Sequence, residues 1–174
     1  MPVPPIATIL IEPVVRAALL EDMGRAGDIT TDAIVPPGAR ARACLVAREA
    51  GVLAGLETAL LAFRLLDATI EARVERPDGS RLSPGDVIAT ITGAARGILS
   101  AERVALNFLC QLSGVASATA AVVDALRGYR TRVTCTRKTV PGLRALQKYA
   151  VRVGGGSNHR FGLHAAMLVK DNHI

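Results

Sequence analysis

Aromatic side chains and long hydrophobic runs are both scarce in this sequence. It has no tryptophan, and aromatic residues make up 3% of its 174 residues. Nucleic-acid-binding modules commonly present exposed aromatics or a recognition helix, so this composition argues against that class. No run reaches the ~18 consecutive apolar residues of a membrane-spanning helix, and the N-terminus lacks the basic segment and cleavage site of a signal peptide. We therefore expect no nucleic-acid partner and no membrane partner.

Cysteine is also scarce, and Cys44, Cys110 and Cys135 are far apart in the chain. They form no CxxC pair and no metal-ligand spacing. An odd, scattered set suits a reducing compartment better than a disulfide framework, so we expect a cytoplasmic protein. Cys135 adjoins a basic motif, but the sequence assigns no base to it. We interpret it as a small buried residue and not as a nucleophile.

Acidic residues are nearly missing from the last part of the chain. Residues 127–174 contain ten Lys and Arg residues and a single acid, Asp171, whereas residues 1–126 contain eleven and fourteen. The net charges are therefore +9 and −3, which give the overall +6. All three histidines also fall in the basic part. Such a concentrated set of cations favours a pocket for a small anion over a long nucleic-acid stripe.

Periodicity and turn residues predict an α+β unit in the first part of the chain. Apolar residues at helical spacing predict helices, and alternating stretches bounded by Gly or Pro predict strands. The expected elements are a helix over 9–23 with Pro13 in its first turn, a polar turn-rich link over 27–38, one or two strands over 41–55, a helix over 55–67, and antiparallel strands over 70–75 and 87–93.

A long helix predicted over 100–128 leads into the second part. Ser100 is its expected N-cap and Gly114 an expected break or kink. The character of the sequence changes there, so we place a domain boundary between 1–113 and 114–174.

The second part is predicted to form one βαβ unit of a parallel sheet or barrel. Its expected elements are a β-rich run over 132–139, a helix beginning near Pro141, a loop over 157–164 and a buried apolar strand over 165–171. A complete barrel of this kind needs about 250 residues. We therefore expect that the chain is cut short at Ile174.

Cations gather at the ends of these two predicted strands. Thr136, Arg137 and Lys138 end the first strand, and Lys170 ends the second. Ligands of parallel sheets bind at this edge, and like charges there repel unless an anion neutralises them. The plainer alternatives are a solvated basic turn for the Arg-Lys pair and a solvent exit for Lys170.

Two further sets of residues are candidates for the same site. Three glycines that would let backbone approach a ligand precede His159 and Arg160, although an ordinary flexible loop would explain the glycines alone. Arg103 lies early in the long helix. The plainer interpretation of Arg103 is a surface arginine paired with Glu102.

The motifs TRKT-x-PGLR, KYAVRVGGGSNHRFGL and KDNHI resemble those of the nicotinate-nucleotide pyrophosphorylase (carboxylating), or quinolinate phosphoribosyltransferase, family. GDITTDAIVP, AREAGVLAGLE, SPGDVI and SAERVALNFLCQLSGVAS extend the resemblance almost from end to end. It implies transfer of a phosphoribosyl group from phosphoribosyl diphosphate to quinolinate with loss of CO₂, giving nicotinate mononucleotide for NAD synthesis. It also implies an α+β N-terminal sandwich followed by the start of an incomplete α/β barrel, and a homodimer.

The resemblance also implies roles for particular residues. Arg137, His159, Arg160 and Lys170 would hold the quinolinate carboxylates, Lys138 would reach the phosphates, and Thr136 would add its hydroxyl or backbone; Lys138 and Lys170 are the catalytic candidates. Arg103 would reach the neighbouring subunit's site. Mg²⁺ is expected with phosphoribosyl diphosphate, held by acids beyond Ile174 and by no metal ligand within the chain, so these residues alone are expected to be inactive.

One departure and two alternatives accompany the resemblance. Many members have an acid before TRKT, where this chain has Cys135, which leaves a local hydrogen bond in doubt. The first alternative is a paralogue of the same fold with another acceptor, such as the molybdenum-transport-associated relatives. The second is a non-catalytic anion-binding protein, which would follow if the reading frame ended at Ile174.

Overall fold

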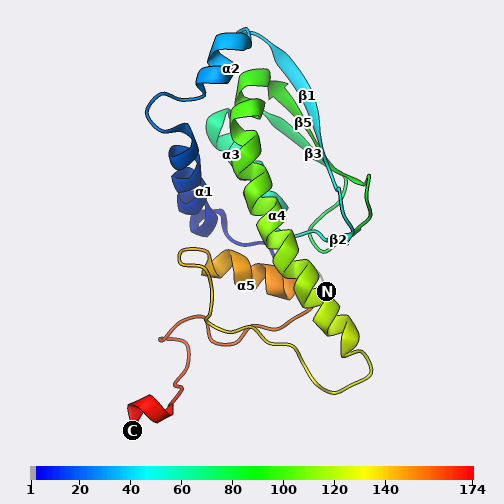
Figure 1. Ribbon diagram of the computed structural model, residues 1–174, viewed down its shortest axis with the longest axis vertical. Helices are drawn as coiled ribbons and strands as arrows, with labels where there is room; N and C mark the ends of the chain where they lie inside the picture. The colour runs from blue at the N-terminus through cyan, green and yellow to red at the C-terminus, as the bar shows by residue number, and fades with distance from the viewer. Residues whose placement is uncertain (1–2) are drawn as a thin grey trace.

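The computed structural model describes residues 3–174 and arranges them as a sheet covered by helices, with a smaller helix and loops below (Figure 1). The elements in chain order are α1 (Thr8–Met23), α2 (Ile29–Ile34), β1 (Arg40–Val46), β2 (Gly51–Val52), α3 (Leu56–Leu66), β3 (Glu71–Val74), β4 (Arg81–Leu82), β5 (Val87–Ala94), α4 (Ala95–Ala125), α5 (Arg144–Val153) and a terminal 3₁₀ turn (Asp171–His173).

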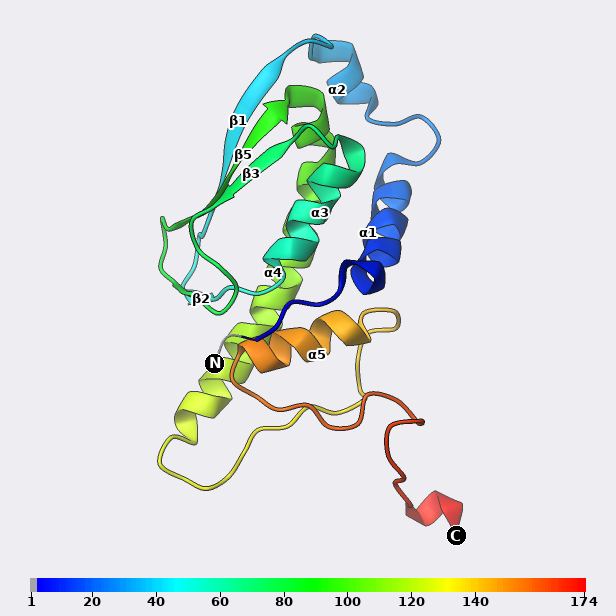
Figure 2. The same cartoon turned by 180° about the vertical axis from the view of Figure 1, so that it is seen from behind.

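The main sheet is antiparallel, with β5 between β1 and β3. The central strand carries the buried residues Ile88, Ala89 and Ile91, whereas every residue of β3 is exposed. Helices α3 and α4 cover one face of the sheet, and α1 lies outside them, as the two opposite views show (Figures 1 and 2). The predicted helix over 55–67 and the predicted antiparallel strands are thus confirmed.

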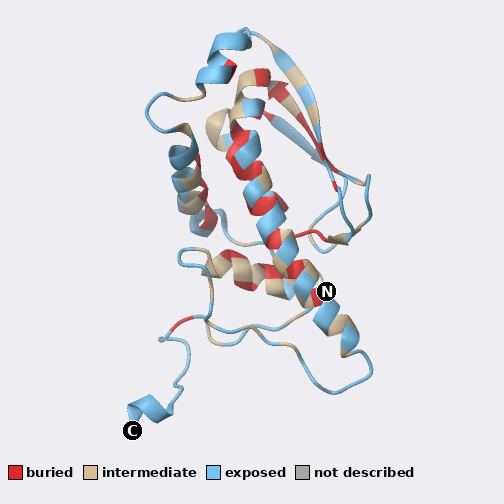
Figure 3. Cartoon of the chain, viewed as in Figure 1, coloured by how far each residue is buried: buried red, intermediate tan, exposed pale blue. Residues whose placement is uncertain are grey.

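Helix α4 is the central element of the core. It buries ten residues against α1, α3, α5 and the sheet, and burial concentrates along this axis (Figure 3). Two of its hydroxyls also accept backbone N–H groups beside β2: Ser117 Oγ from Val52 at 2.8 Å and Ser113 Oγ from Ala54 at 3.1 Å. By length and composition alone, α4 is the one helix of residues 3–174 that could cross a membrane. Its place in the core accounts for the same apolar composition.

Two expectations for α4 are wrong. The helix begins at Ala95, so Ser100 lies inside it, and its hydroxyl donates to Asp28 Oδ2 at 3.0 Å instead of capping the helix. Gly114 neither breaks nor ends the helix, because the favourable packing of α4 outweighs the weak helix preference of a single glycine. The expected boundary near residue 113 therefore falls inside a continuous helix.

The segment predicted as a polar link contains a helix, α2. Asp28 caps it by accepting the Thr31 N–H at 2.9 Å, which the sequence interpretation overlooked. This hydrogen bond lowers the pKa of the Asp28 carboxyl below its usual value. Arg96 then ties α2 to the start of α4, since its guanidinium reaches Asp32 Oδ1 and Val35 O, both at 2.8 Å. Pro13 lies in the second turn of α1 and not in its first.

Asp78 joins the sheet-bearing part to α5. Its carboxylate accepts the N–H groups of Gly55 and Leu56 at the start of α3, at 2.9 and 3.0 Å, and the Tyr149 hydroxyl of α5 at 2.8 Å. Burial and the neighbouring Asp78 charge raise the pKa of Tyr149 above its usual value. Gly55 has a φ of 90°, a conformation that glycine adopts without strain.

The βαβ prediction is only partly realised. Helix α5 exists and ends before Gly154 as expected, although it begins at Arg144 and not near Pro141. In place of a strand over 132–139 there is one parallel bridge, Thr134 with Ser157. The predicted buried strand over 165–171 is wrong: Met167 is 96% exposed and Val169 is 67% exposed. No strand within residues 3–174 pairs with this segment, so it lacks the ladder of backbone hydrogen bonds and the covering layer that a buried strand needs.

The glycine run packs closely against α4 at the end of α5. A Cβ on Gly154 would meet the carbonyl oxygen of Ala116 and, at 2.7 Å, the Cβ of Thr119, both on α4. A Cβ on Gly156 would meet Thr119 as well, and Gly155 has a φ of 89°. These glycines let the chain turn sharply against α4 at the end of α5.

Candidate anion-binding site

Two segments that carry predicted site residues run side by side below α5. The Cys135 N–H donates to Ser157 O at 3.0 Å, and the Ser157 N–H donates to Val133 O at 2.9 Å. Side-chain exposure alternates from Val133 to Thr139, so that Cys135 and Arg137 face inward while Thr136 and Lys138 face outward. The structure thus brings the TRKT motif beside the segment that leads to His159 and Arg160.

Arg137 is the member of the TRKT motif that points inward. Its Nε is buried without a hydrogen-bond partner, and it is the one buried side-chain nitrogen or oxygen in this condition among residues 3–174. A buried donor without a partner costs free energy, on the order of 1–3 kcal/mol. The guanidinium therefore has an unused donor suited to a carboxylate or phosphate oxygen.

The rest of the motif is held by its own threonines. Thr136 Oγ1 accepts the Lys138 N–H at 3.1 Å, which fixes the turn and leaves the exposed Lys138 ammonium free to extend outward. Thr139 Oγ1 accepts from Arg144 Nε at 3.2 Å, and Arg144 Nη1 also reaches Phe161 O at 3.4 Å. Arg144 thus links the two segments, a role that sequence reasoning missed.

The second segment contributes an exposed imidazole and a partly buried guanidinium. Arg160 Nη1 donates to Ala166 O at 2.9 Å, and so holds the following loop. The side chain of His159 is exposed, whereas its carbonyl oxygen accepts from Lys148 Nζ at 3.0 Å. Both residues lie on the segment that pairs with Val133 and Cys135.

Lys148 is the second residue that sequence reasoning missed. Helical periodicity puts it opposite Leu146 and Ala150 on α5, where solvent is expected, yet it is only 2% exposed. Its ammonium donates to Cys135 Sγ at 2.9 Å and to the His159 carbonyl oxygen. No pattern in the sequence signals this burial, because it depends on loops that fold back over α5 from both sides.

Thr136, Arg137, Lys138, His159 and Arg160 form the cationic cluster. Lys170 and Arg103 are not brought to it. Lys170 lies on the exposed terminal segment, which projects away from α5 in both views, and its N–H donates to His173 Nδ1 at 3.0 Å (Figures 1 and 2). Two strand ends that carry cations side by side are therefore not observed. Arg103 is exposed on the half of α4 that lies along the sheet, and it forms no ion pair with Glu102. Its place in a neighbouring subunit's site stays a prediction.

The charges of the basic part are almost entirely unneutralised. Of the ten Lys and Arg residues in 127–174, only Arg127 contacts a carboxylate within residues 3–174, at 2.7 Å from Asp124 Oδ1. The other nine, the cluster cations included, repel one another and attract anions. In the part of the chain that the structure describes, no three His, Cys, Asp or Glu residues gather as a metal site.

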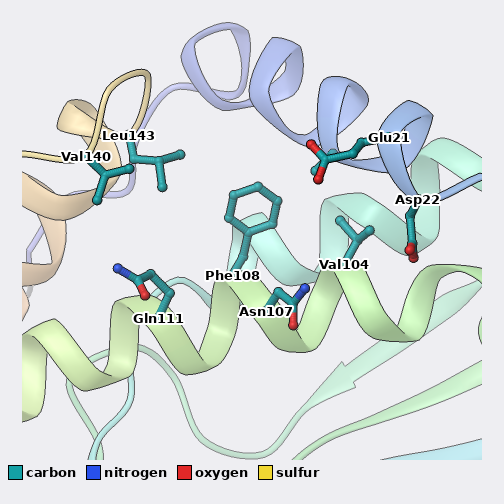
Figure 4. A pocket seen from close by; sticks show the side chains of 9 residues that line it. Glu21, Asp22, Val104, Asn107, Phe108, Gln111, Val140 and Leu143 are labelled. Atoms are coloured by element: carbon teal, nitrogen blue, oxygen red, sulfur yellow. The ribbon is translucent and has the colours of Figure 1, made fainter.

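An apolar hollow lies beside the cluster (Figure 4). Its volume is about 360 Å³, and its lining comes from α1, α4 and the loop after TRKT, which contributes Val140 and Leu143. Phe108 points into it from α4, and Glu21 and Asp22 stand on its α1 side. The acids and apolar walls do not suit an anion, so the hollow and the cationic cluster are chemically distinct.

Comparison with known proteins identifies both parts of the chain. Residues 28–113 match the family model "Quinolinate phosphoribosyl transferase, N-terminal domain", and residues 115–174 match the model for the C-terminal domain of the same family. The chain is similar to nicotinate-nucleotide pyrophosphorylase [carboxylating] of Mycobacterium leprae, with 51% identity over 164 residues, or 92% of this chain and 57% of that protein.

Solved structures agree with this match. NadC from Streptococcus pyogenes superimposes with a TM-score of 0.94 and 48% identity, over 98% of this chain and 60% of that one. The nicotinate-nucleotide pyrophosphorylase from Francisella tularensis gives 0.92 and 37%, over 100% of this chain and 62% of that one. This chain thus spans a little more than half the length of these relatives. The chain belongs to the quinolinate phosphoribosyl transferase family.

Proposed function

We propose that the complete protein transfers the phosphoribosyl group of phosphoribosyl diphosphate to quinolinate, with decarboxylation. The products are nicotinate mononucleotide, diphosphate and CO₂, and the pathway is NAD biosynthesis. Membership of the family and the names of the similar proteins support this reaction. Arg137 is the observation that carries it here, because its buried, unpartnered Nε lies in a region with nine unneutralised cations.

The proposed substrates match this charge. Quinolinate is a dianion, and phosphoribosyl diphosphate carries several negative charges, so binding both requires many cations close together. Arg137 offers a planar fork suited to a carboxylate, whereas Lys138 offers a compact charge suited to a phosphate. His159 and Arg160 lie on the adjoining segment and would hold the second carboxylate.

Positioning and charge stabilisation account for the chemistry without a protein nucleophile. The quinolinate nitrogen attacks the ribose C1 as the bond to diphosphate breaks, through a transition state with oxocarbenium character. The ring nitrogen is then cationic. When the adjacent carboxylate leaves as CO₂, the electron pair of the broken bond stays on the ring carbon, where the cationic nitrogen stabilises it, and that carbon then takes up a proton from water to give the product. Cations on the retained carboxylate keep the ring in place through both steps.

Magnesium is expected with phosphoribosyl diphosphate, but the described residues do not form a site for it. Mg²⁺ prefers carboxylate oxygens, and residues 127–174 offer only Asp171, on the exposed terminal segment. Residues 127–174 therefore do not fit the ion by themselves, and no step of the reaction is assigned to it.

The assembly proposed for the complete protein is a cytoplasmic homodimer in which Arg103 serves the neighbouring subunit's site. Arg103 supports this, since it is exposed on α4 and contacts no carboxylate within residues 3–174. The sheet-bearing part would be the N-terminal sandwich, and residues 114–174 would begin an α/β barrel. The parallel bridge between Thr134 and Ser157 is consistent with that start.

The test is the reaction of the protein expressed from its complete reading frame. With quinolinate, phosphoribosyl diphosphate and Mg²⁺, we expect nicotinate mononucleotide and CO₂ in equal amounts, measured by chromatography and by release of labelled carbon. Product from another acceptor with none from quinolinate would favour the same-fold paralogue. Anion binding without any turnover would favour the non-catalytic alternative.

Two variants test the catalytic candidates. Lys138→Ala and Lys170→Ala should each lower kcat/KM by about 100-fold, which corresponds to roughly 2.7 kcal/mol of lost charge stabilisation. Arg130→Ala is the matched control, because Arg130 is an exposed cation of the same part of the chain. If Lys170→Ala behaved like Arg130→Ala, the role assigned to Lys170 would be wrong.

A further inference from the structure

Lys148 is the only charged side chain of residues 3–174 that is buried, at 2% exposed. A lysine ammonium has three N–H donors and is costly to remove from water. Here it has two acceptors, Cys135 Sγ at 2.9 Å and the His159 carbonyl oxygen at 3.0 Å. No carboxylate lies within ion-pair distance of it in this part of the structure. Packing alone does not explain why a lysine is buried at this position without a carboxylate partner.

The two acceptors belong to the two segments of the anion-binding cluster. Cys135 is two residues before Arg137, and its side chain faces inward with that of Arg137. His159 is itself a cluster residue and precedes Arg160. Helix α5 is anchored independently, since Leu146 and Ala150 are buried in the core and Tyr149 binds Asp78. Lys148 thus connects α5 to both segments, next to the candidate site residues Arg137, His159 and Arg160.

We propose that Lys148 is a positioning residue, which sets the separation between Arg137 and the His159–Arg160 pair so that both reach one dianionic ligand. The inference rests on the proposed function for the identity of that ligand, quinolinate. Because Lys148 is buried and acts through Cys135 and the His159 carbonyl, its loss should weaken binding of substrate and transition state alike. That effect appears in KM and not in kcat.

The test uses the complete protein and two variants of the same helix. Lys148→Met keeps the length of the side chain but removes both hydrogen bonds. Arg152→Met is the matched control, since Arg152 is an exposed cation one turn further along α5. Lys148→Met should raise the KM for quinolinate about tenfold, because small misplacements of binding groups are costly, while kcat stays within about twofold.

Hydrogen exchange gives a second measurement that does not depend on the reaction. The Cys135 and Ser157 amides, which join the two segments, should exchange faster in Lys148→Met and at the unchanged rate in Arg152→Met. If the parent protein had no activity, the proposed function would fail. The hydrogen-exchange rates alone would then show whether Lys148 holds the two segments together. Faster exchange with an unchanged KM would make Lys148 merely structural and overturn the proposal.

Cys135→Ala covers the case in which Lys148→Met does not fold. It removes one acceptor and leaves the ammonium bound to the His159 carbonyl, so the effect should be smaller and confined to the first segment. We expect faster exchange at residue 135 and a KM raised about threefold, in keeping with the loss of one modest hydrogen bond. A KM equal to that of the parent protein would overturn the proposal by this route also.

Discussion

The sheet-bearing part of the chain and the basic part after α4 differ in how many of their cations are paired with carboxylates. In residues 1–126, six of the eleven arginines contact a carboxylate, and acids outnumber them. In residues 127–174, one of ten cations does so within the described structure. The first surface is neutralised by its own side chains. The second leaves nine of its cations without a carboxylate partner in the described structure, so they repel one another and attract anions.

The largest expected effect concerns the contact that joins the two parts. Gly154→Ala would place a Cβ against the α4 backbone at Ala116, so α5 must shift, and we expect a loss of about 2–3 kcal/mol of unfolding free energy. Gly38→Ala is the control, because its Cβ would meet nothing within 4 Å. Urea denaturation measures both. Equal stability of the two variants would show that the close contact is not needed.

The second effect tests the charge comparison directly. Arg137→Ala should weaken quinolinate binding by the complete protein roughly 10- to 100-fold, the value of a hydrogen-bonded charge. Arg73→Ala should leave it unchanged, since Arg73 is already paired with Glu75 at 2.6 Å in the neutralised part. Titration calorimetry at fixed ionic strength measures both. Equal losses would mean that net charge alone, and not the arrangement of the cluster, attracts the anion.

A smaller effect comes from the cap of α2. The pKa of Asp28 is lowered by its hydrogen bond from Thr31, so the ionised form is favoured in the folded state. The stabilisation that the Asp28 carboxylate gives to the folded protein is therefore complete above the ordinary pKa of an aspartate, about 3.9. It is lost as the pH falls through the lower pKa that Asp28 has in the folded protein. Asp28→Ala should lower the melting temperature at pH 7, and the difference from the parent protein should shrink in acid. A difference that grew in acid would contradict this assignment.

The smallest effect is expected at the junction itself. Gly114 lies inside α4, and a Cβ there would meet nothing within 4 Å. Gly114→Ala should therefore stabilise the protein by about 0.5–1 kcal/mol, through helix preference and a less flexible unfolded chain. Thermal denaturation measures this change. A destabilised variant would indicate that a hinge at Gly114 matters to the fold.

Sequence reasoning predicted those elements whose burial depends on local periodicity. The helix over 55–67 and the strands of the antiparallel sheet agree closely with α3, β3 and β5, because each has one apolar face against a nearby element. The prediction of a strand over 165–171 was wrong because the partner elements are missing from the described structure. Residues 165–171 have the composition of a buried strand, but pairing and burial need partners that residues 3–174 do not supply.

The site was predictable where adjacent residues share a role and not where distant loops combine. The order of Thr136, Arg137 and Lys138 predicts a candidate anion-binding segment, and the structure places it beside the segment of His159. Neither the unpartnered Nε of Arg137 nor the burial of Lys148 could be read from the sequence. Both depend on how two loops, separated by the whole of α5, fold over it.

The triple contact of Asp78 has a consequence for the order of assembly. One carboxylate caps α3 and receives the Tyr149 hydroxyl from 71 residues further along the chain. Closing so long a loop is entropically costly until its target is already fixed. We therefore expect the start of α3 to act as a template on which α5 docks, and the loops of the cationic cluster to take shape last. A ribosome delivering the chain from its N-terminus would complete the template before the cations emerge.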